Sequence, residues 1–229
     1  MNITIIPGSF KPPHKGHLSL IEKLIKNKNN SKIIILITKK PRPLDSRILY
    51  PENSPKIDLQ NALIDYLPNE KNNIINLNKK LIIEKIKELI NVNILKSINA
   101  QQSLKIWKIY IKYLKNKYNN IILPKIICKI CESNSMIKDT FNIVRTLFKD
   151  KKQIILMKSE KNKDNKRFNL FERSYNKYVK TALFPNIKDI DATGMRTSIL
   201  KNDKNTFMKY LPKNLENNAK NKIWKICSS

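Results

Sequence analysis

The stretch NITIIPGSFKPPHKGHLSLIEKLIKN, residues 2–27, decides the fold and holds most of the rarest residues of the chain. Residues 2–6 form a short run of apolar and β-branched residues, which predicts a strand. Residues 18–27 place four aliphatic side chains at helical spacing, which predicts a helix with one buried face. The loop between them therefore follows the carboxyl end of a strand, where open α/β sheets bind their ligands.

The alternation of strands and helices continues along the chain. Further strands are predicted at 32–38, 120–130, 152–157 and 179–185, and helices at 57–67, 79–92, 99–114, 135–149, 194–201 and 213–226. Near-continuous aliphatic strands that alternate with helices predict an α/β domain with a parallel, five-stranded sheet. Residues 41–95 open with a proline-rich stretch and predict a helical insertion within a single domain spanning 1–229.

Composition limits the class of protein. The chain has 229 residues, of which 41% are hydrophobic and 28% charged, so it can fold around one sizeable core. No aliphatic run is long enough to cross a bilayer, and the first residues do not resemble a signal peptide. Three cysteines, an odd number, give no disulfide framework. We therefore expect a cytoplasmic protein with no membrane association, and a homo-oligomer stays open.

The net charge of +28 attracts any polyanion, so non-specific nucleic-acid binding stays open. Only six of the 46 basic residues are arginine, the preferred residue for binding phosphate forks and base edges. The lysines are spread along the whole chain, and Lys, Asn and Ile are the residues that AT-rich coding sequences produce. The charge therefore favours compositional drift over dedicated nucleic-acid recognition.

The loop PGSFKPPHKGH, residues 7–17, contains both histidines and two of the three glycines of the chain. Gly8 is predicted to let the backbone turn sharply and approach a ligand. His14 and His17 are three residues apart, so they share one face of the first helical turn. Gly16 leaves room for a bulky group at the helix N-terminus, where free amides favour an anion. Together these features predict a phosphate site.

Other interpretations of the rare residues were weighed. The turn could be structural, with His14 and His17 capping the helix. A zinc site on the two histidines would need further ligands, and the chain has no other histidine. Cys128 and Cys131 lie inside a predicted strand and read as packing residues rather than as a redox or zinc motif.

The segment GSFKPPHKGH resembles the signature of the nucleotidyltransferase superfamily with the HxGH motif, which includes adenylyltransferases and cytidylyltransferases. A second segment, DIDATGMRTSIL at 189–200, is similar to the ISxTxxR pattern of that superfamily. Thr193 and Arg196 align with the motif threonine and the phosphate-binding basic residue, whereas Asp191 stands where the family usually has serine. The resemblance covers most of the chain except roughly 41–95.

Two further segments strengthen the resemblance. INAQQSLKIW at 98–107 is similar to the ISAEQR-type helix start seen in members. ILMKSEKNKDNKRF at 155–168 resembles the loop at a strand end where Asp and Arg flank the nucleotide. Asn99 and Gln102 also form a predicted capping box.

The resemblance implies a Rossmann-like fold and a nucleotidyl transfer reaction. An acceptor phosphate or carboxylate attacks the α-phosphorus of a nucleoside triphosphate, and pyrophosphate leaves. The implied catalytic residues are His14, His17, Arg196 and Lys11. The implied nucleotide-binding residues are Gly8, Ser9, Phe10, Gly16, Thr193, Gly194, Lys158, Asp164 and Arg167. Mg²⁺ is expected to bind through the triphosphate, with no protein metal ligand.

ATP is the favoured nucleotide, because DATGMR is closer to the adenylyltransferase form of the motif than to the RTxGxST form of cytidylyltransferases. A CTP-dependent enzyme and an inactive nucleotide-binding module with a polyanion-binding surface are the alternatives. The acceptor is expected to be a small phosphorylated molecule, with nicotinamide mononucleotide, phosphopantetheine and a sugar or alcohol phosphate all open. Residues 41–95 are the expected place for it.

Overall fold

The structure is a computed structural model that describes residues 2–92, 94–149, 153–159, 168, 171, 173–175, 177–184 and 190–229. The strands are β1 Asn2–Gly8, β2 Asn30–Ile37, β3 Arg42–Pro43, β4 Ser97–Ile98, β5 Lys125–Ile130, β6 Gln153–Ser159 and β7 Val179–Phe184. The helices are α1 Lys15–Lys26, α2 Lys56–Tyr66, α3 Lys71–Asn76, α4 Lys79–Asn91, α5 Ala100–Lys117, α6 Met136–Phe148, α8 Ala192–Leu200, α9 Lys204–Met208 and α10 Asn217–Ser228, with short 3₁₀ helices η1 Ser46–Ile48 and η2 Pro68–Glu70. In the described part of the chain, no helix has the length and apolar character needed to span a membrane.

Five strands form one sheet in the order β5-β2-β1-β6-β7, and every neighbouring pair is parallel. The predicted α/β fold with a five-stranded parallel sheet is therefore confirmed. The predicted strand at 120–130 is wrong over its first five residues, because β5 begins only at Lys125. Ile122 is fully exposed, so the apolar run begins several residues before the part of the segment that pairs with β2.

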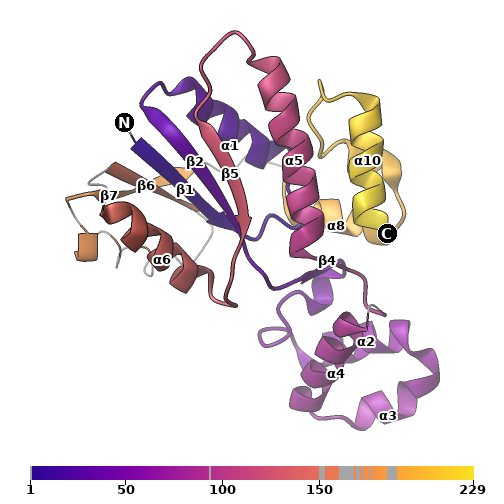
Figure 1. Ribbon diagram of the computed structural model, residues 1–229. Coiled ribbons are helices and arrows are strands. Elements are labelled where there is room, and N and C mark those ends of the chain that lie inside the picture. The colour runs from indigo at the N-terminus through magenta and orange to yellow at the C-terminus, as the bar shows by residue number, and fades with distance from the viewer. Residues whose placement is uncertain are drawn as a thin grey trace.

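Side chains that alternate along the strands build a core on each face of the sheet. In β2, Ile33 and Ile35 join the cluster formed with α1, α5, α8 and α10, whereas Ile34 joins the cluster formed with α6. This alternation follows from the pleat, which points successive side chains to opposite faces. Figure 1 shows α6 on one side of the sheet and α5 and α10 beyond the β5 edge. The sheet is thus covered on both faces, as a parallel sheet requires.

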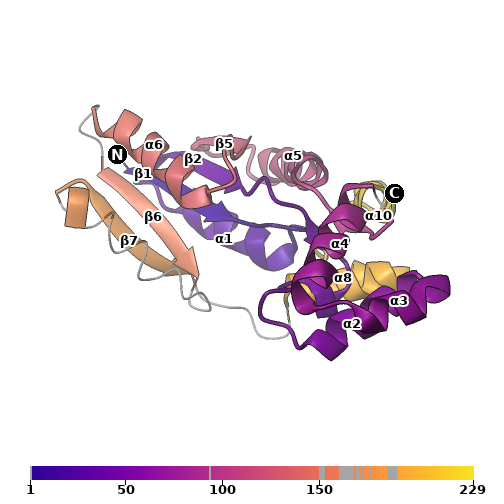
Figure 2. The same cartoon turned by 90° about the horizontal axis from the view of Figure 1, so that it is seen from below.

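The predicted insertion has a hydrophobic core of its own. This core is formed by Ile48, Leu59, Ala62, Leu63, Ile74, Ile82, Ile86, Leu89 and Leu95. A short antiparallel ladder, with Arg42 opposite Ile98 and Pro43 opposite Ser97, closes the insertion at its base. Figures 1 and 2 show α2, α3 and α4 projecting from the end of the sheet at which β1 and β2 finish. That the chain forms a single domain stays a prediction.

The sequence prediction missed three short features. These are α3, α9 and the β3–β4 ladder, each too short for a hydrophobic period to be visible. The proline-rich stretch contains one short 3₁₀ helix, η1, at Ser46–Ile48 between the prolines at 43 and 51. The capping box of α5 is confirmed, because the Asn99 side chain accepts from the Gln102 amide and the Gln102 side chain accepts from the Asn99 amide.

Candidate active site

Two helices begin close together at the carboxyl end of β1. His14 is the N-cap of α1, and Asp191 is the N-cap of α8. Arg196 of α8 donates from Nη1 to the backbone carbonyl of Lys11 over 3.0 Å, so α8 lies against the loop 8–17. The two motifs that are 180 residues apart in the sequence are therefore joined directly in the fold, where an open α/β sheet places its ligand.

Both histidines cap α1 through their Nδ1 atoms. His14 Nδ1 accepts from the amide of Gly16, and His17 Nδ1 accepts from the amide of His14, each over 3.2 Å. The interpretation that the two histidines cap the helix is therefore confirmed. It does not compete with phosphate binding, because a neutral imidazole whose Nδ1 accepts must carry its proton on Nε2. Each ring is left with one N–H donor for a ligand.

The histidine rings are held in place by aromatic neighbours. The two rings stack with centroids 3.8 Å apart, and the Phe10 ring meets His17 edge-on at 4.9 Å. The Phe10 ring in turn packs edge-on against Trp107, with ring centroids 5.5 Å apart. Burial lowers the pKa of His14 to about 4 and holds the pKa of His17 well below 6.5. Both imidazoles are therefore neutral donors at physiological pH.

The tight turn of the loop is made by Phe10 rather than by Gly8. Phe10 has φ of 50°, in the left-handed region, whereas none of the three glycines has a positive φ. Gly8 lies in β1 opposite Ile37, and a Cβ on it would come within 2.6 Å of the Phe10 ring. The expectation that Gly8 turns the backbone is therefore wrong. The glycine makes room for the ring that supports His17.

Arg196 is buried, with 4% of its surface exposed. Besides the bond to Lys11, its Nη2 donates to Thr193 Oγ1 over 3.0 Å, while its Nε has no partner among the described residues. Burial, followed by the nearby charge of Arg42, lowers the pKa of Arg196 to about 10, so the group stays charged at neutral pH. A buried donor without a partner is costly and marks a place for a ligand acceptor.

Lys11 does not point where the resemblance implies. The residue is 1% exposed, and its ammonium donates to the carbonyl oxygens of Thr38 and Lys40 and to Thr38 Oγ1. Burial, followed by the charge of Arg42, lowers its pKa to about 7. The side chain holds the segment after β2 against the loop. A direct contact between this ammonium and the reacting phosphate is therefore not supported by the geometry.

Arg42 is a site residue that the sequence analysis missed. Its Nε donates to Ser9 Oγ over 3.3 Å, and its guanidinium lies 4.9 Å from the centre of the Tyr50 ring. It stands at the base of the insertion, in β3. The scarcity of arginine, which singled out Arg196, would have singled out Arg42 equally.

Three cations thus gather at the carboxyl end of β1. Arg42 lowers the pKa values of both Lys11 and Arg196, which is the effect of like charges at close range. Within the described residues, none of the three forms an ion pair with a carboxylate. Like charges that lie close together and form no ion pair among the described residues favour a multiply charged anion. The neutral donors of His14 and His17 lie beside them.

The remaining predicted residues occupy different places. Lys158 is the penultimate residue of β6, opposite Leu183 of β7, at the same carboxyl edge. Asp164 and Arg167 lie outside the described residues. Within the described part of the chain, no group of three or more His, Cys, Asp or Glu side chains comes together in a way that could hold a metal ion.

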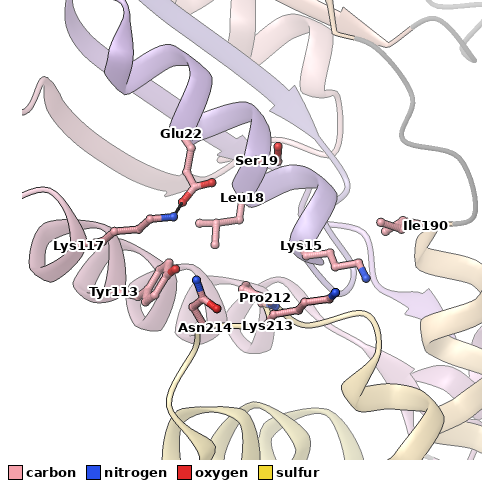
Figure 3. A pocket seen from close by; sticks show the side chains of 10 residues that line it. All are labelled: Lys15, Leu18, Ser19, Glu22, Tyr113, Lys117, Ile190, Pro212, Lys213 and Asn214. Atoms are coloured by element: carbon pink, nitrogen blue, oxygen red, sulfur yellow. Dashed lines mark hydrogen bonds and ion pairs between the residues drawn. The ribbon is translucent and has the colours of Figure 1, made fainter.

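A pocket of about 280 Å³ opens beside the first turn of α1. It is lined by Lys15, Leu18, Ser19, Glu22, Tyr113, Lys117, Ile190, Pro212, Lys213 and Asn214. Figure 3 shows Lys15 and Ile190 at one end and the Glu22–Lys117 ion pair, 2.7 Å long, at the other. Ile190 directly precedes the cap of α8, so this pocket borders both helix starts.

The sequence model of the cytidylyltransferase-like family matches residues 5–123. The chain belongs to this family. The match contains the HxGH loop, the insertion and the whole of α5, and it ends before β5. The predicted membership of the HxGH nucleotidyltransferase superfamily is thereby confirmed, and with it nucleotidyl transfer as the class of reaction.

Two solved structures resemble the chain over nearly its full length. Both are Plasmodium falciparum nicotinic acid mononucleotide adenylyltransferase, one complexed with APC and one with NaAD. The first is 14% identical with a TM-score of 0.43 and covers 98% of this chain and 94% of that one. The second is 15% identical with a TM-score of 0.42 and covers 98% and 95%. Similarity at this level specifies no substrate. The comparison with curated proteins gives no match.

Proposed function

We propose that this enzyme transfers AMP from ATP to a small phosphate-bearing acceptor and releases pyrophosphate. The observation that carries the proposal is that Arg42 and Arg196 lie close together beside two neutral histidine donors, and that neither arginine forms an ion pair with a carboxylate among the described residues. A triphosphate and an acceptor phosphate supply the negative charge that this arrangement lacks. The choice of ATP rests on the DATGMR form of the second motif.

The histidines have the role of charge stabilisation. Their Nε2–H groups are aimed by the capping bonds and the aromatic contacts, so they need little reorganisation as negative charge develops. In-line attack by the acceptor needs no covalent intermediate, and catalysis consists of positioning and charge stabilisation. Because both rings are neutral, they stabilise the phosphates as donors and not as acids.

Arg196 and Arg42 would each bind the phosphates of a different substrate. Arg196 carries a free Nε and lies beside Thr193, so we assign it to the β- and γ-phosphates. Arg42 stands at the base of the insertion with its guanidinium over the Tyr50 ring, so we assign it to the phosphate of the acceptor. Mg²⁺ would be held by the triphosphate and would neutralise charge on the leaving pyrophosphate.

Pyrophosphate release tests the proposal. The purified chain is given ATP or CTP with each of several phosphorylated acceptors, and pyrophosphate is measured with and without EDTA. We expect release with ATP, dependence on one acceptor class and loss of turnover in EDTA. Faster release from CTP would favour the cytidylyltransferase alternative. Binding of ATP without release by any acceptor would favour the inactive module, which the carboxylate of Asp191 at α8 makes the second candidate.

Three further predictions about the whole protein stay open to experiment. We infer a cytoplasmic location from the free cysteines at 128, 131 and 227 together with the intracellular nature of nucleoside triphosphates. The net charge of +28 makes weak, salt-sensitive binding to nucleic acid an expected side property. Assembly into a homo-oligomer is best measured directly in solution.

A further inference from the structure

The segment 209–211 connects the two helix starts of the site. The first amide of α1, that of Lys15, donates to the carbonyl oxygen of Tyr210 over 2.8 Å. The Lys15 ammonium donates to the carbonyl oxygen of Lys209 over 2.7 Å. An orphan donor of the helix N-terminus is thus satisfied by a chain segment almost 200 residues away in the sequence.

The side chain of Tyr210 meets the other helix start. A Cβ on Gly194 would lie 2.1 Å from the Tyr210 hydroxyl oxygen and 2.9 Å from Cζ, so the hydroxyl end of the Tyr210 ring rests on the bare Cα of this glycine. Gly194 is in the first turn of α8, and its amide donates to the Asp191 cap over 2.7 Å. Its φ is not positive, so an alanine would suit the helix if the ring were elsewhere.

The segment is anchored firmly enough to act as a spacer. Phe207 and Leu211, on either side of Tyr210, are buried in the core cluster that contains Leu18 of α1 and Met195 of α8. The chain then continues through Pro212, which lines the pocket of Figure 3 beside Lys15. A displacement of Tyr210 would therefore move both helix starts relative to each other.

We propose that Tyr210 is a positioning residue, which sets the separation between the histidines at the start of α1 and Arg196 at the start of α8. The inference rests on the proposed function, because that separation matters only if both helix starts bind one substrate. Burial, followed by the charge of Asp191, raises the pKa of the Tyr210 hydroxyl, so it stays protonated and neutral. The contact with Gly194 is steric, and it is made by the hydroxyl oxygen and by Cζ, which is close enough by itself to exclude a Cβ and is kept in Y210F.

Three variants of the full chain test this role. Y210A removes the ring and keeps the backbone carbonyl, Y210F keeps the ring, and Y118A removes a partly buried tyrosine at the end of α5 as the control. We expect Y210A to lower kcat for pyrophosphate release by about ten- to a hundredfold, the loss typical of reacting groups displaced by about 1 Å. The KM for ATP should change by less than about threefold. Y210F and Y118A should stay within about threefold of the wild type.

The substitution Gly194→Ala disturbs the same contact from α8. It provides a test of the inference even if Y210A does not fold. Alone it should lower kcat by pushing the ring away, even though alanine favours a helix. In the Y210A background it should have little further effect, because the contact is already gone. If Gly194→Ala lowered kcat in the Y210A background by the same factor as in the wild type, the inference would be overturned.

Other results would also overturn it. One is a Y210A enzyme as active as Y118A, and another is a Y210F enzyme as impaired as Y210A, which would assign the effect to the hydroxyl. Hydrogen exchange of the Lys15 amide gives a readout independent of activity and should quicken in Y210A but not in Y118A. Absence of pyrophosphate release by the wild type would instead refute the proposed function, so the two failures are distinguishable.

Discussion

The starts of α1 and α8 are capped by side chains of different charge, neutral at α1 and negative at α8. Each helix leaves free amides at its N-terminus, and each uses its cap side chain to satisfy one of them. At α1 the caps are neutral imidazoles, so the positive end of the helix dipole keeps its attraction for an anion. At α8 the cap is the carboxylate of Asp191, which already supplies negative charge.

The difference indicates where the substrate charge lies. The negative charge of Asp191 disfavours phosphate at the α8 amides, and Arg196 extends away from them to the carbonyl of Lys11 in the other loop. We therefore expect the phosphates to bind over the start of α1, with α8 contributing a cation rather than an amide cradle. On this proposal, Asp in place of the motif serine is compatible with activity.

The largest expected effect is at His17. His17→Gln should lower kcat by about 10²–10³, as for other preorganised donors, because a flexible glutamine whose Oε1 accepts from the cap amide does not hold its N–H donors where the rigid imidazole holds Nε2–H. The affinity for ATP, measured by calorimetry, should change much less. Glutamine at this position can still accept from the cap amide, so the helix should keep its stability.

His17→Ala separates the two roles of the residue. It should lose the same factor in kcat as His17→Gln and, in addition, about 1 kcal/mol of stability from the lost capping bond. Thermal unfolding of both variants measures the difference. A kcat that survives within a few-fold in either variant would refute the assignment of the loop.

The next effect in size is at Arg196. Arg196→Lys keeps the charge but loses the planar fork that now bonds Lys11 and Thr193 and leaves Nε for a ligand. We expect kcat/KM for ATP to fall at least about tenfold, which is about 1.4 kcal/mol. AMP, used as a competitor, should lose less affinity. Equal losses for ATP and AMP would place Arg196 away from the leaving pyrophosphate.

The sequence was sufficient for the fold and for the two motifs because both depend on local signals. Aliphatic periodicity located the sheet, and the scarcity of His, Gly and Arg marked His14, His17 and Arg196. The direction of the Lys11 side chain could not be predicted, because it depends on carbonyls 27 and 29 residues away. The same holds for Gly194, since the ring that excludes its Cβ comes from Tyr210.

A moderate loss of stability is expected at low pH from His14, the N-cap of α1. The folded-state pKa of His14, about 4, is below its ordinary value of 6.5, so the unfolded chain binds the proton first as pH falls. Stability is therefore complete above pH 6.5 and is lost as pH falls toward 4. Between pH 6.5 and 5 this amounts to about 2 kcal/mol, or about 4–8 °C in Tm.

The double variant H14N/H17Q checks the source of that loss. Both replacements can cap a helix, and neither titrates in this range. Its Tm should fall less than that of the wild type when the pH is lowered from 6.5 to 5. Identical falls would show that the acid sensitivity comes from groups other than the two histidines.

The smallest effect, at Asp191, tests the comparison most directly. Asp191→Ser keeps a good N-cap for α8 and removes only the negative charge, so the fold should be retained. If that carboxylate repels phosphates bound over α1, the variant should bind ATP about two- to fivefold more tightly, as expected for the 0.3–1 kcal/mol of a charge at a helix terminus. The gain should shrink at high salt, and Asp203→Ser, which alters the cap of α9 instead, should show none. Weaker ATP binding by Asp191→Ser would mean that the carboxylate serves the substrate, and the contrast between the two helix starts would then have to be abandoned.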